Sequence, residues 1–304
     1  MRRDLWRVGP DRTVSLDPWC LMGVVNATPD SFSDGGLHLD PERAARHAVE
    51  LVEAGASIID VGGESTRPGA ARVAPSEQIE RVVPVIRSLR RALGNREATV
   101  TIDTTSAEVA AAGLDAGADA VNDVSGGLED ERMLELVAER HVGIVLMHRL
   151  QAPEDDSYSD QYETEPSYRD VVGDVVGLLS DRIQAAKRSG IHNDAIMVDP
   201  GFGFGKSVEQ NFDLMRGIDR IIGLGHPVLV GLSRKSFLGA VTEIEDPARR
   251  DPASATAAVL LGDPRGLVFR VHDVAAHRRA LLLRSAIQLS RLGERADSTE
   301  LGTR

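Results

Sequence analysis

The chain has 304 residues, of which 42% are hydrophobic and 27% charged, the proportions of a soluble globular protein with a large buried core. Its net charge of −12 argues against nucleic acid or an anionic membrane as the main partner. One cysteine, Cys20, excludes an internal disulfide or a cysteine metal cluster, and no apolar run reaches the length of a membrane span, so we expect a cytoplasmic enzyme or binding protein.

Apolar, β-branched runs recur eight times along the chain, each followed by a segment with helical periodicity. The predicted strands are residues 21–26, 57–63, 99–105, 119–124, 142–148, 195–200, 227–233 and 267–273. Eight strand–helix units without a linker-like break predict an α/β fold, a single (β/α)8 TIM barrel over residues 21–293. A doubly wound parallel sheet is the alternative. We expect residues 1–20 to form an N-terminal extension and residues 294–304 a flexible tail.

The helix predicted at residues 41–54 carries clear boundary signals. Its apolar residues recur at helical spacing along one face, Asp40 supplies a cap ahead of a first-turn proline, and Gly55 marks the end. The pattern at residues 76–93 is also helical, and Pro84 predicts a kink or a break within it.

Residues 149–166, RLQAPEDDSYSDQYETEP, interrupt the alternation of strands and helices after the fifth strand. The segment is acidic and contains two of the three tyrosines. A loop of this length is either a lid or a solvated surface insertion, and its composition favours the insertion.

Polar residues stand at the ends of several predicted strands, where a barrel carries its ligand site. Because side chains alternate between the two faces of a strand, Asp103, Asn122 and Asp199 are predicted to point into the barrel. Each has a structural alternative as a helix cap, a buried amide or a turn residue, although for Asp103 the capping-box spacing of Thr105 and Glu108 already supplies the cap. Together the three suit the donor edge of a flat heterocycle, or a hard cation.

Arg270 and His272 are predicted to share the inward face of the last strand. Such a pair needs an anionic partner, either an internal carboxylate or, as we favour, a ligand phosphate. The C-terminal ends of the strands form the mouth of such a barrel. Loops after the first, second and seventh predicted strands add further polar residues to this mouth: Asn26, Asp34, Thr66, Arg67, Arg234, Lys235 and Ser236. This set predicts an anion site, with Asn26 and Asp34 able to hold a Mg²⁺ ion that bridges phosphates.

The stretch VDPGFGFGKS, residues 198–207, looks like a phosphate-binding loop. That loop has the spacing G-x-x-x-x-G-K-[ST], which requires a glycine where this chain has Pro200. We therefore interpret the stretch as the end of the sixth strand, with Asp199 recognising a ligand and Phe204 forming a wall. Of the two lysines in loops after strands, we assign Lys235 to the site and Lys206 to a structural role.

Eight segments resemble the motifs of the dihydropteroate synthase family in that family's order: NATPDSFSDGG, GGESTRPG, TIDT, VNDVSGG, LMH, DPGFGFGK, GLSRKSFLG and RVHDV. They lie between residues 21 and 274, so the resemblance covers nearly the whole chain. The family is built on a pterin-binding TIM barrel and is a sulfonamide target in folate biosynthesis. Its reaction condenses p-aminobenzoate with 6-hydroxymethyl-7,8-dihydropterin diphosphate to give 7,8-dihydropteroate and pyrophosphate.

The resemblance implies roles for the matched residues on the pterin and aminobenzoate sides. Asp103, Asn122 and Asp199 would hydrogen-bond the pterin ring, in a slot lined by Met147 and Lys235. The residues that would shape the p-aminobenzoate site are Thr66, Pro68, Phe204 and Ser236.

On the anion side, the resemblance implies that Arg67, Arg270 and His272 bind the diphosphate. Asn26, joined by Asp34, would ligate Mg²⁺ as the cofactor. The expected catalytic residues are Arg270, His272 and Asp103. A homodimer formed through barrel helices late in the chain is also implied.

Two alternatives to a synthase remain open from the sequence. A pterin-dependent methyltransferase barrel shares the Asp/Asn/Asp set but needs no diphosphate or aminobenzoate site, so STRPG, SRKS and RVH favour the synthase. A non-catalytic pterin-binding paralogue would keep the fold without the activity. The chain departs from the family beside the LMH motif, where Arg149 replaces the usual methionine.

Overall fold

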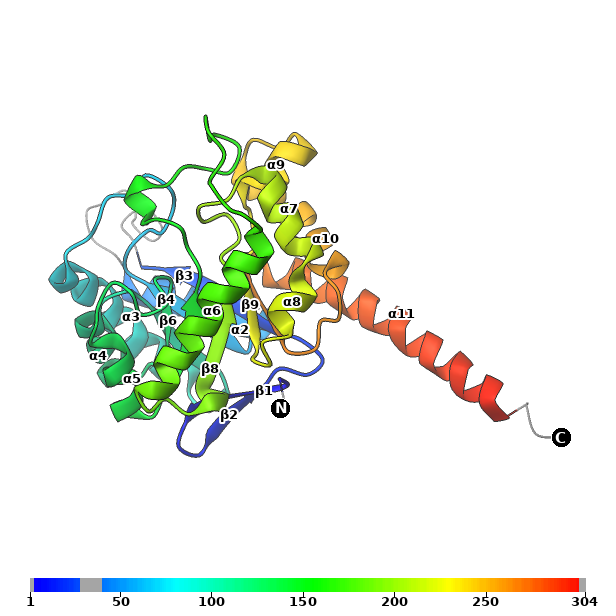
Figure 1. Ribbon diagram of the computed structural model, residues 1–304. Helices are drawn as coiled ribbons and strands as arrows, with labels where there is room; N and C mark the ends of the chain where they lie inside the picture. The colour runs from blue at the N-terminus through cyan, green and yellow to red at the C-terminus, as the bar shows by residue number, and fades with distance from the viewer. Residues whose placement is uncertain (1–2, 28–39, 301–304) are drawn as a thin grey trace.

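Eight parallel strands close into a barrel in the computed structural model, which describes residues 3–27 and 40–300 (Figure 1). The strands are β3 (Cys20–Asn26), β4 (Ile58–Gly62), β5 (Thr99–Asp103), β6 (Ala120–Asp123), β7 (Gly143–Met147), β8 (Ile196–Asp199), β9 (Val228–Val230) and β10 (Leu267–Val271). Strand β10 pairs with both β9 and β3, which closes the ring. The fold is a (β/α)8 TIM barrel, as predicted, and not a doubly wound sheet.

Helices surround the barrel and cover its outer face (Figure 1). They are α2 (Pro41–Ala54), α3 (Pro75–Leu93), α4 (Ala107–Ala116), α5 (Met133–Arg140), α6 (Val171–Arg188), α7 (Val208–Arg216), α8 (Ile218–Ile222), α9 (Ser236–Thr242), α10 (Asp251–Leu260) and α11 (Val274–Glu300). The described residues also contain three short 3-10 turns, η1 (Pro153–Asp155), η2 (Asn193–Ala195) and η3 (Pro247–Arg250).

The helix boundaries test the local signals in the sequence. Helix α2 begins after Asp40, whose side chain accepts two backbone hydrogen bonds, and ends at Gly55 with φ of 115°, as predicted. Helix α3 continues through Pro84, so the predicted break does not occur. The cap of α4 is Ser106 rather than Thr105, because the Ser106 side chain accepts the hydrogen bond from the first turn.

The buried side chains form two layers, one between the barrel and the helices and one inside the barrel. The lumen is filled from alternate positions on the strands: Cys20, Met22, Ile58, Ala120, Val145, Met197, Leu229 and Val268. This alternation confirms the predicted inward faces of β6, β8 and β10. The next inward position on each of these strands is Asn122, Asp199 and Arg270, at the mouth.

An antiparallel hairpin, β1 (Leu5–Gly9) and β2 (Arg12–Ser15), packs on the barrel at the N-terminal ends of its strands. Trp6 is fully buried, and its indole Nε1 donates to the O of Ala195 at 2.9 Å, just before β8. At Gly143, where β7 begins, a Cβ would lie 2.9 Å from the Trp6 ring. The sequence did not predict this hairpin, which fills one end of the barrel and leaves the opposite mouth for a ligand.

The last helix, α11, leaves the barrel and projects away from the rest of the molecule (Figure 1). Residues 294–300, which the sequence suggested as part of a flexible tail, form the end of this helix, and residues 301–304 lie outside the described residues. Within the part of the chain that the structure describes, no helix is both long and apolar enough to cross a membrane.

Candidate active site

A guanidinium group stands at the centre of the mouth between two carboxylates. Arg270, on β10, donates from Nε to Oδ2 of Asp60 at 2.7 Å and from Nη2 to Oδ2 of Asp103 at 2.8 Å. Asp60 is fully buried, whereas 23% of the Arg270 side chain is exposed, so the arginine faces the mouth. Of the two partners considered for Arg270, the structure shows the internal carboxylates.

Asp60 was missed by the sequence analysis, although it connects three inward side chains. Besides the bond from Arg270, its carboxylate accepts from Oγ1 of Thr101 and, at 3.0 Å, from Nδ2 of Asn122. Alternation of side chains along residues 58–61 would have predicted the position of Asp60. It places this carboxylate on the lumen face of an otherwise apolar strand.

Two buried oxygen atoms at this mouth have no hydrogen-bond partner among the described residues: Oδ1 of Asp103 and Oδ1 of Asn122. A buried acceptor left unpaired costs about 1–3 kcal/mol, so a folded protein rarely keeps one without a reason. Burial and the charge of Asp60 raise the pKa of Asp103 to about 7. Both oxygen atoms are therefore placed to accept hydrogen bonds from a ligand.

Asp199 ends β8 and is fixed by the glycine-rich turn that follows. The N–H of Gly201 donates to Oδ1 of Asp199 at 2.7 Å, and burial raises the pKa of Asp199 to about 6. Gly201, Gly203 and Gly205 all have positive φ. At Gly201 a Cβ would lie 1.9 Å from the O of His148, so only glycine fits against this backbone.

Lys206 lies beneath the same turn and is fully buried. Its Nζ donates to the O atoms of Gly201 and Phe204, both at 2.9 Å, and lies 3.1 Å from Nδ1 of His148. Burial lowers the pKa of Lys206 to about 7 and that of His148 to about 3, which leaves the imidazole as a neutral acceptor. Lys206 thus supports the turn, in agreement with the structural role predicted for it.

Lys235 and Phe204 lie against each other at the mouth. The Nζ of Lys235 is 4.0 Å from the centre of the Phe204 ring, and burial lowers the pKa of Lys235 to about 8. Ser236 begins α9, and its Oγ accepts from the N–H of Ser159 at 3.0 Å. Met147 ends β7 and is buried.

His272 follows β10 on the cationic side of the mouth. Its Nδ1 lies 2.9 Å from Oγ of Ser233. Burial, followed by the charges of Arg234, Arg270 and Arg67, lowers the pKa of His272 to about 3. The neutral imidazole therefore stands in a positive field, which favours an anionic ligand.

Of the two residues predicted to hold Mg²⁺, the structure places one. Asn26 is the last residue of β3 and pairs in register with Gly62, while Asp34 lies outside the described residues. Among residues 3–27 and 40–300, no three His, Cys, Asp or Glu side chains gather as a metal cluster. An amide oxygen at a phosphate site fits Mg²⁺, because this ion is usually held by one or two protein oxygens together with substrate phosphates and water.

The loop that carries Thr66, Arg67 and Pro68 is joined to the 149–166 segment. The N–H of Gly69 donates to the O of Pro153 at 2.8 Å. A cavity between the two segments is lined by residues that include Thr66, Arg72, Arg149, Pro153 and Glu154. The aminobenzoate residues predicted from the sequence thus fall on two sides of the mouth, Thr66 and Pro68 on this loop and Phe204 and Ser236 after β8 and β9.

The 149–166 segment is solvated in part, as its composition suggested, because five of its six acidic residues are exposed: Glu154, Asp155, Asp160, Glu163 and Glu165. Other residues of the segment are tied to neighbouring loops. Asp156 and Ser159 are buried. Oδ2 of Asp156 accepts from the N–H of Gly205 at 2.9 Å, and Oγ of Ser159 accepts from Asn211 at 3.1 Å. The segment is therefore part of the mouth, because its polar groups bind the loops that follow other strands.

The mouth of this barrel combines unpaired buried acceptors with a cationic side, and both features fit a pterin-binding enzyme. The family model described as "Pterin binding enzyme" matches residues 22–272. The dihydropteroate synthase of Streptococcus pyogenes is 44% identical over 260 residues, which is 85% of this chain and 91% of that protein. The dihydropteroate synthase of Mycobacterium leprae is 43% identical over 274 residues, 88% of this chain and 93% of that one.

Solved structures agree with these relatives. Xanthomonas albilineans dihydropteroate synthase with 4-aminobenzoic acid has a TM-score of 0.83 and 41% identity, covering 94% of this chain and 98% of that one. The same enzyme in complex with 7,8-dihydropteroate has a TM-score of 0.80 and 39% identity over 93% of this chain and 98% of that one. The chain belongs to the dihydropteroate synthase family and is a transferase of folate biosynthesis.

Proposed function

We propose that the mouth binds 6-hydroxymethyl-7,8-dihydropterin diphosphate and joins its methylene carbon to the amine of p-aminobenzoate. The observation that carries the pterin assignment is the pair of unpaired oxygens, Oδ1 of Asp103 and Oδ1 of Asn122. With Asp199 they offer acceptors from three strands to the donor edge of the ring. Met147 and Lys235 line the slot.

The diphosphate lies on the cationic side, against Arg67, Arg270 and His272. Burial, and then the charges of Arg234, Arg270 and Arg67, lower the pKa of His272, and the positive field of these arginines supports this placement. Asn26, joined by Asp34, would hold Mg²⁺ at the diphosphate side of the mouth. When bound, Mg²⁺ supplies further neutralisation of phosphate charge.

In the proposed reaction the C–O bond to the diphosphate breaks first, and its electron pair leaves with pyrophosphate. Arg270 and His272 stabilise the charge that develops on the leaving group. The pterin ring delocalises the positive charge left on the methylene carbon, and the carboxylate of Asp103 favours that cation. The lone pair of the aryl amine then forms the C–N bond, and the amine loses one proton.

The aminobenzoate ring is placed beside Phe204 and Ser236, with Thr66 and Pro68 closing the other side. The contact between Lys235 and the Phe204 ring supports this position, because it sets the aromatic wall next to the pterin slot. Xanthomonas albilineans dihydropteroate synthase, similar over 94% of this chain, has been solved with 4-aminobenzoic acid.

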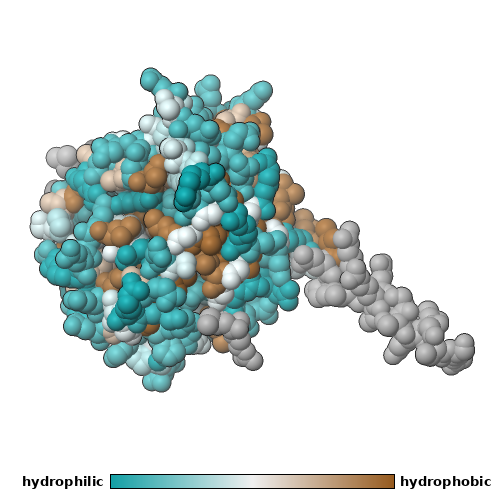
Figure 2. All heavy atoms as spheres, viewed as in Figure 1, coloured by the Kyte–Doolittle hydropathy of each residue, from teal (hydrophilic) through white to brown (hydrophobic). Residues whose placement is uncertain are grey.

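We also propose a cytoplasmic homodimer formed through helices late in the chain. Leu260 on α10 and Leu283 on α11 are exposed over 74% and 68% of their surface. Apolar side chains gather where α11 leaves the barrel (Figure 2). Light scattering on the purified protein tests this assembly; a monomer mass at micromolar concentration would contradict it.

Production of 7,8-dihydropteroate and pyrophosphate from the two purified substrates tests the proposed function. Growth of a folate-auxotrophic strain that lacks its own synthase tests it in cells. Soluble protein that binds the pterin but gives neither product nor growth would identify a non-catalytic paralogue. Transfer of a methyl group from a methylated folate would identify a methyltransferase instead.

A further inference from the structure

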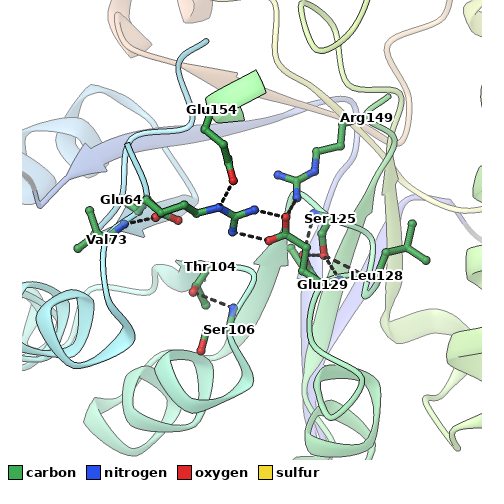
Figure 3. A network of polar contacts seen from close by, with 11 residues as sticks. Glu64, Val73, Thr104, Ser106, Ser125, Leu128, Glu129, Arg149 and Glu154 are labelled. Atoms are coloured by element: carbon green, nitrogen blue, oxygen red, sulfur yellow. Dashed lines mark hydrogen bonds and ion pairs between the residues drawn. The ribbon is translucent and has the colours of Figure 1, made fainter. Parts of the chain in front are cut away.

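Charged residues link the loop that follows β4 to the rest of the mouth (Figure 3). Arg72 donates from Nη1 to Oε2 of Glu129 at 2.8 Å and from Nε to Oε1 of Glu154 at 2.5 Å, while its Nη2 contacts Oε1 of Glu129. Arg149 contacts the same Oε1 atom of Glu129. Glu129 thus receives one arginine from the β4 loop and one from the 149–166 segment.

The β4 loop is closed at its base by its own hydrogen bonds. The N–H of Val73 donates to Oε1 of Glu64 at 2.6 Å, and Nε2 of Gln78 donates to the O of Val73 at 2.9 Å. Residues 65–72, which include Thr66 and Pro68, therefore form a compact loop between two joined ends. Arg72 is the residue of this loop that holds it to Glu129 and Glu154.

Glu129 is a fixed point for the loop because it is anchored to strand β6. Asp123, at the end of β6, is fully buried and accepts from the N–H of Ser125 at 2.8 Å and from its Oγ at 2.7 Å. Oγ of Ser125 in turn accepts from the N–H of Glu129 at 3.3 Å, a contact drawn in Figure 3. The loop is thus attached to the strand that also carries Asn122.

The network is shielded at Arg149 and Glu129, whereas 45% of the Arg72 side chain is exposed. The exposed fraction is 8% for the Arg149 side chain and 23% for Glu129. Burial alone would raise the pKa of Glu129, but hydrogen bonds from Arg72 and Thr105 and the charge of Arg149 lower it to about 2. Isolated exposed pairs contribute little, whereas partly buried networks that share a carboxylate hold their geometry.

We propose that Arg149 and Arg72 are positioning residues that hold the Thr66–Pro68 loop in place through Glu129. The inference rests on the proposed role of Thr66 and Pro68 at the p-aminobenzoate site. A loop held before the substrate arrives loses less conformational freedom when it binds. The network therefore acts on the KM for p-aminobenzoate and, through Arg67 on the same loop, on the KM for the pterin diphosphate, and it leaves kcat unchanged.

Substitutions at Arg149 test whether the network acts on KM and leaves kcat unchanged. Arg149→Met removes the charge and keeps an unbranched side chain. It should raise the KM for p-aminobenzoate about fivefold, and the KM for the pterin diphosphate as well, without changing kcat. Arg149→Lys keeps the charge and should recover part of the loss. Arg140→Met, which breaks the exposed pair with Asp115 between two outer helices, is the matched control and should change none of the constants. An unchanged KM for p-aminobenzoate in Arg149→Met, or a fall in kcat with both KM values unchanged, would overturn the proposal.

A double-mutant cycle tests whether Arg149 acts through Glu129. In a Glu129→Gln background, Arg149→Met should have little further effect on the KM for p-aminobenzoate, and full additivity would overturn the proposed link.

Amide hydrogen exchange of residues 65–72 in the substrate-free protein gives a readout that needs no activity. Exchange there should be about fivefold faster in Arg149→Met and unchanged in Arg140→Met. Equal exchange rates in the wild type and in Arg149→Met would overturn the proposal that Arg149 holds this loop in place. A wild-type protein that makes no dihydropteroate but shows the faster exchange in Arg149→Met would overturn the proposed function alone.

Discussion

The carboxylate of Asp60 and the guanidinium of Arg270 are joined by a 2.7 Å hydrogen bond across the floor of the mouth. The same buried carboxylate accepts from Asn122 at 3.0 Å. One group therefore positions a residue assigned to the diphosphate and a residue assigned to the pterin ring. The separation of these two parts of the substrate site is set by the spacing of strands β4, β6 and β10.

Replacing Asp60 by Asn should lower kcat/KM for the pterin diphosphate about 100-fold, because the amide keeps the shape but loses the charge and one acceptor oxygen. Steady-state kinetics measure this change, and Asp115→Asn, at an exposed pair between outer helices, is the control. A variant with the wild-type kcat/KM would show that Arg270 and Asn122 hold their positions without Asp60.

Arg270→Ala should reduce turnover by about two orders of magnitude or more, because a charged donor to the leaving pyrophosphate is lost. It should also destabilise the fold, since Asp60 and Asp103 would be left as buried carboxylates without their cation. Adding Asp60→Asn should restore part of the melting temperature but none of the activity. Wild-type turnover in Arg270→Ala would exclude the catalytic role, whatever its stability.

Binding of pyrophosphate should be accompanied by proton uptake at His272. In the free enzyme, burial and the neighbouring arginines lower the pKa of His272 to about 3, and an anion beside the ring raises it. Because the bound state then holds more protons, the affinity for pyrophosphate should rise as the pH falls through the pKa of the bound imidazole toward about 3. Calorimetry in buffers of different ionisation enthalpy counts the protons. Comparison with His272→Gln separates the proton taken up by the histidine from protons taken up by pyrophosphate itself. Equal proton uptake by both proteins would refute the assignment of the uptake to His272.

The free energy of unfolding of the ligand-free enzyme should depend on the protonation of Asp103. Burial raises the pKa of Asp103 from 3.8 to about 7, so the folded protein holds this proton more tightly than the unfolded chain. The resulting stabilisation is fully present below about pH 4 and is lost as the pH rises through about 7. Urea unfolding at several pH values measures this dependence. The free energy of unfolding should change less with pH in Asp103→Asn than in the wild type, by more than about 1 kcal/mol between the lowest and the highest pH. Parallel profiles would mean that Asp103 is ionised throughout.

The barrel and most of the site could be predicted because their signals are local. The ends of α2 follow from Asp40 and Gly55, and the inward position of Asp199 follows from alternation along one strand. Asp60 obeys the same alternation, but it stands inside an apolar run, two residues ahead of the GGESTRPG motif and outside it. Its importance comes from Arg270, 210 residues away, and the sequence does not show that contact.

Other errors arose where distant contacts decide what a residue does. The acidic composition of residues 149–166 correctly predicted solvation for most of its carboxylates. It failed for Asp156, which is buried and accepts the N–H of Gly205, 49 residues away. Helix α3 continues through Pro84 because neighbours such as Val82 and Val85 are fully buried against the barrel, which compensates for one missing backbone hydrogen bond.

Gly203 and Gly177 offer a matched pair of glycines for testing the turn after β8. Gly203 has a positive φ, and a Cβ there would lie 2.8 Å from Cδ of Lys235. Alanine must displace Lys235 or distort the turn, so Gly203→Ala should lower kcat/KM about tenfold and cost about 1 kcal/mol of stability. Gly177 lies on the exposed face of α6 with open space around it, and alanine there should stabilise the protein by up to about 1 kcal/mol without changing the kinetics. If Gly203→Ala kept the wild-type kcat/KM while losing stability, the turn would serve the fold alone, and the position of Lys235 would have to be set by the loop after β9.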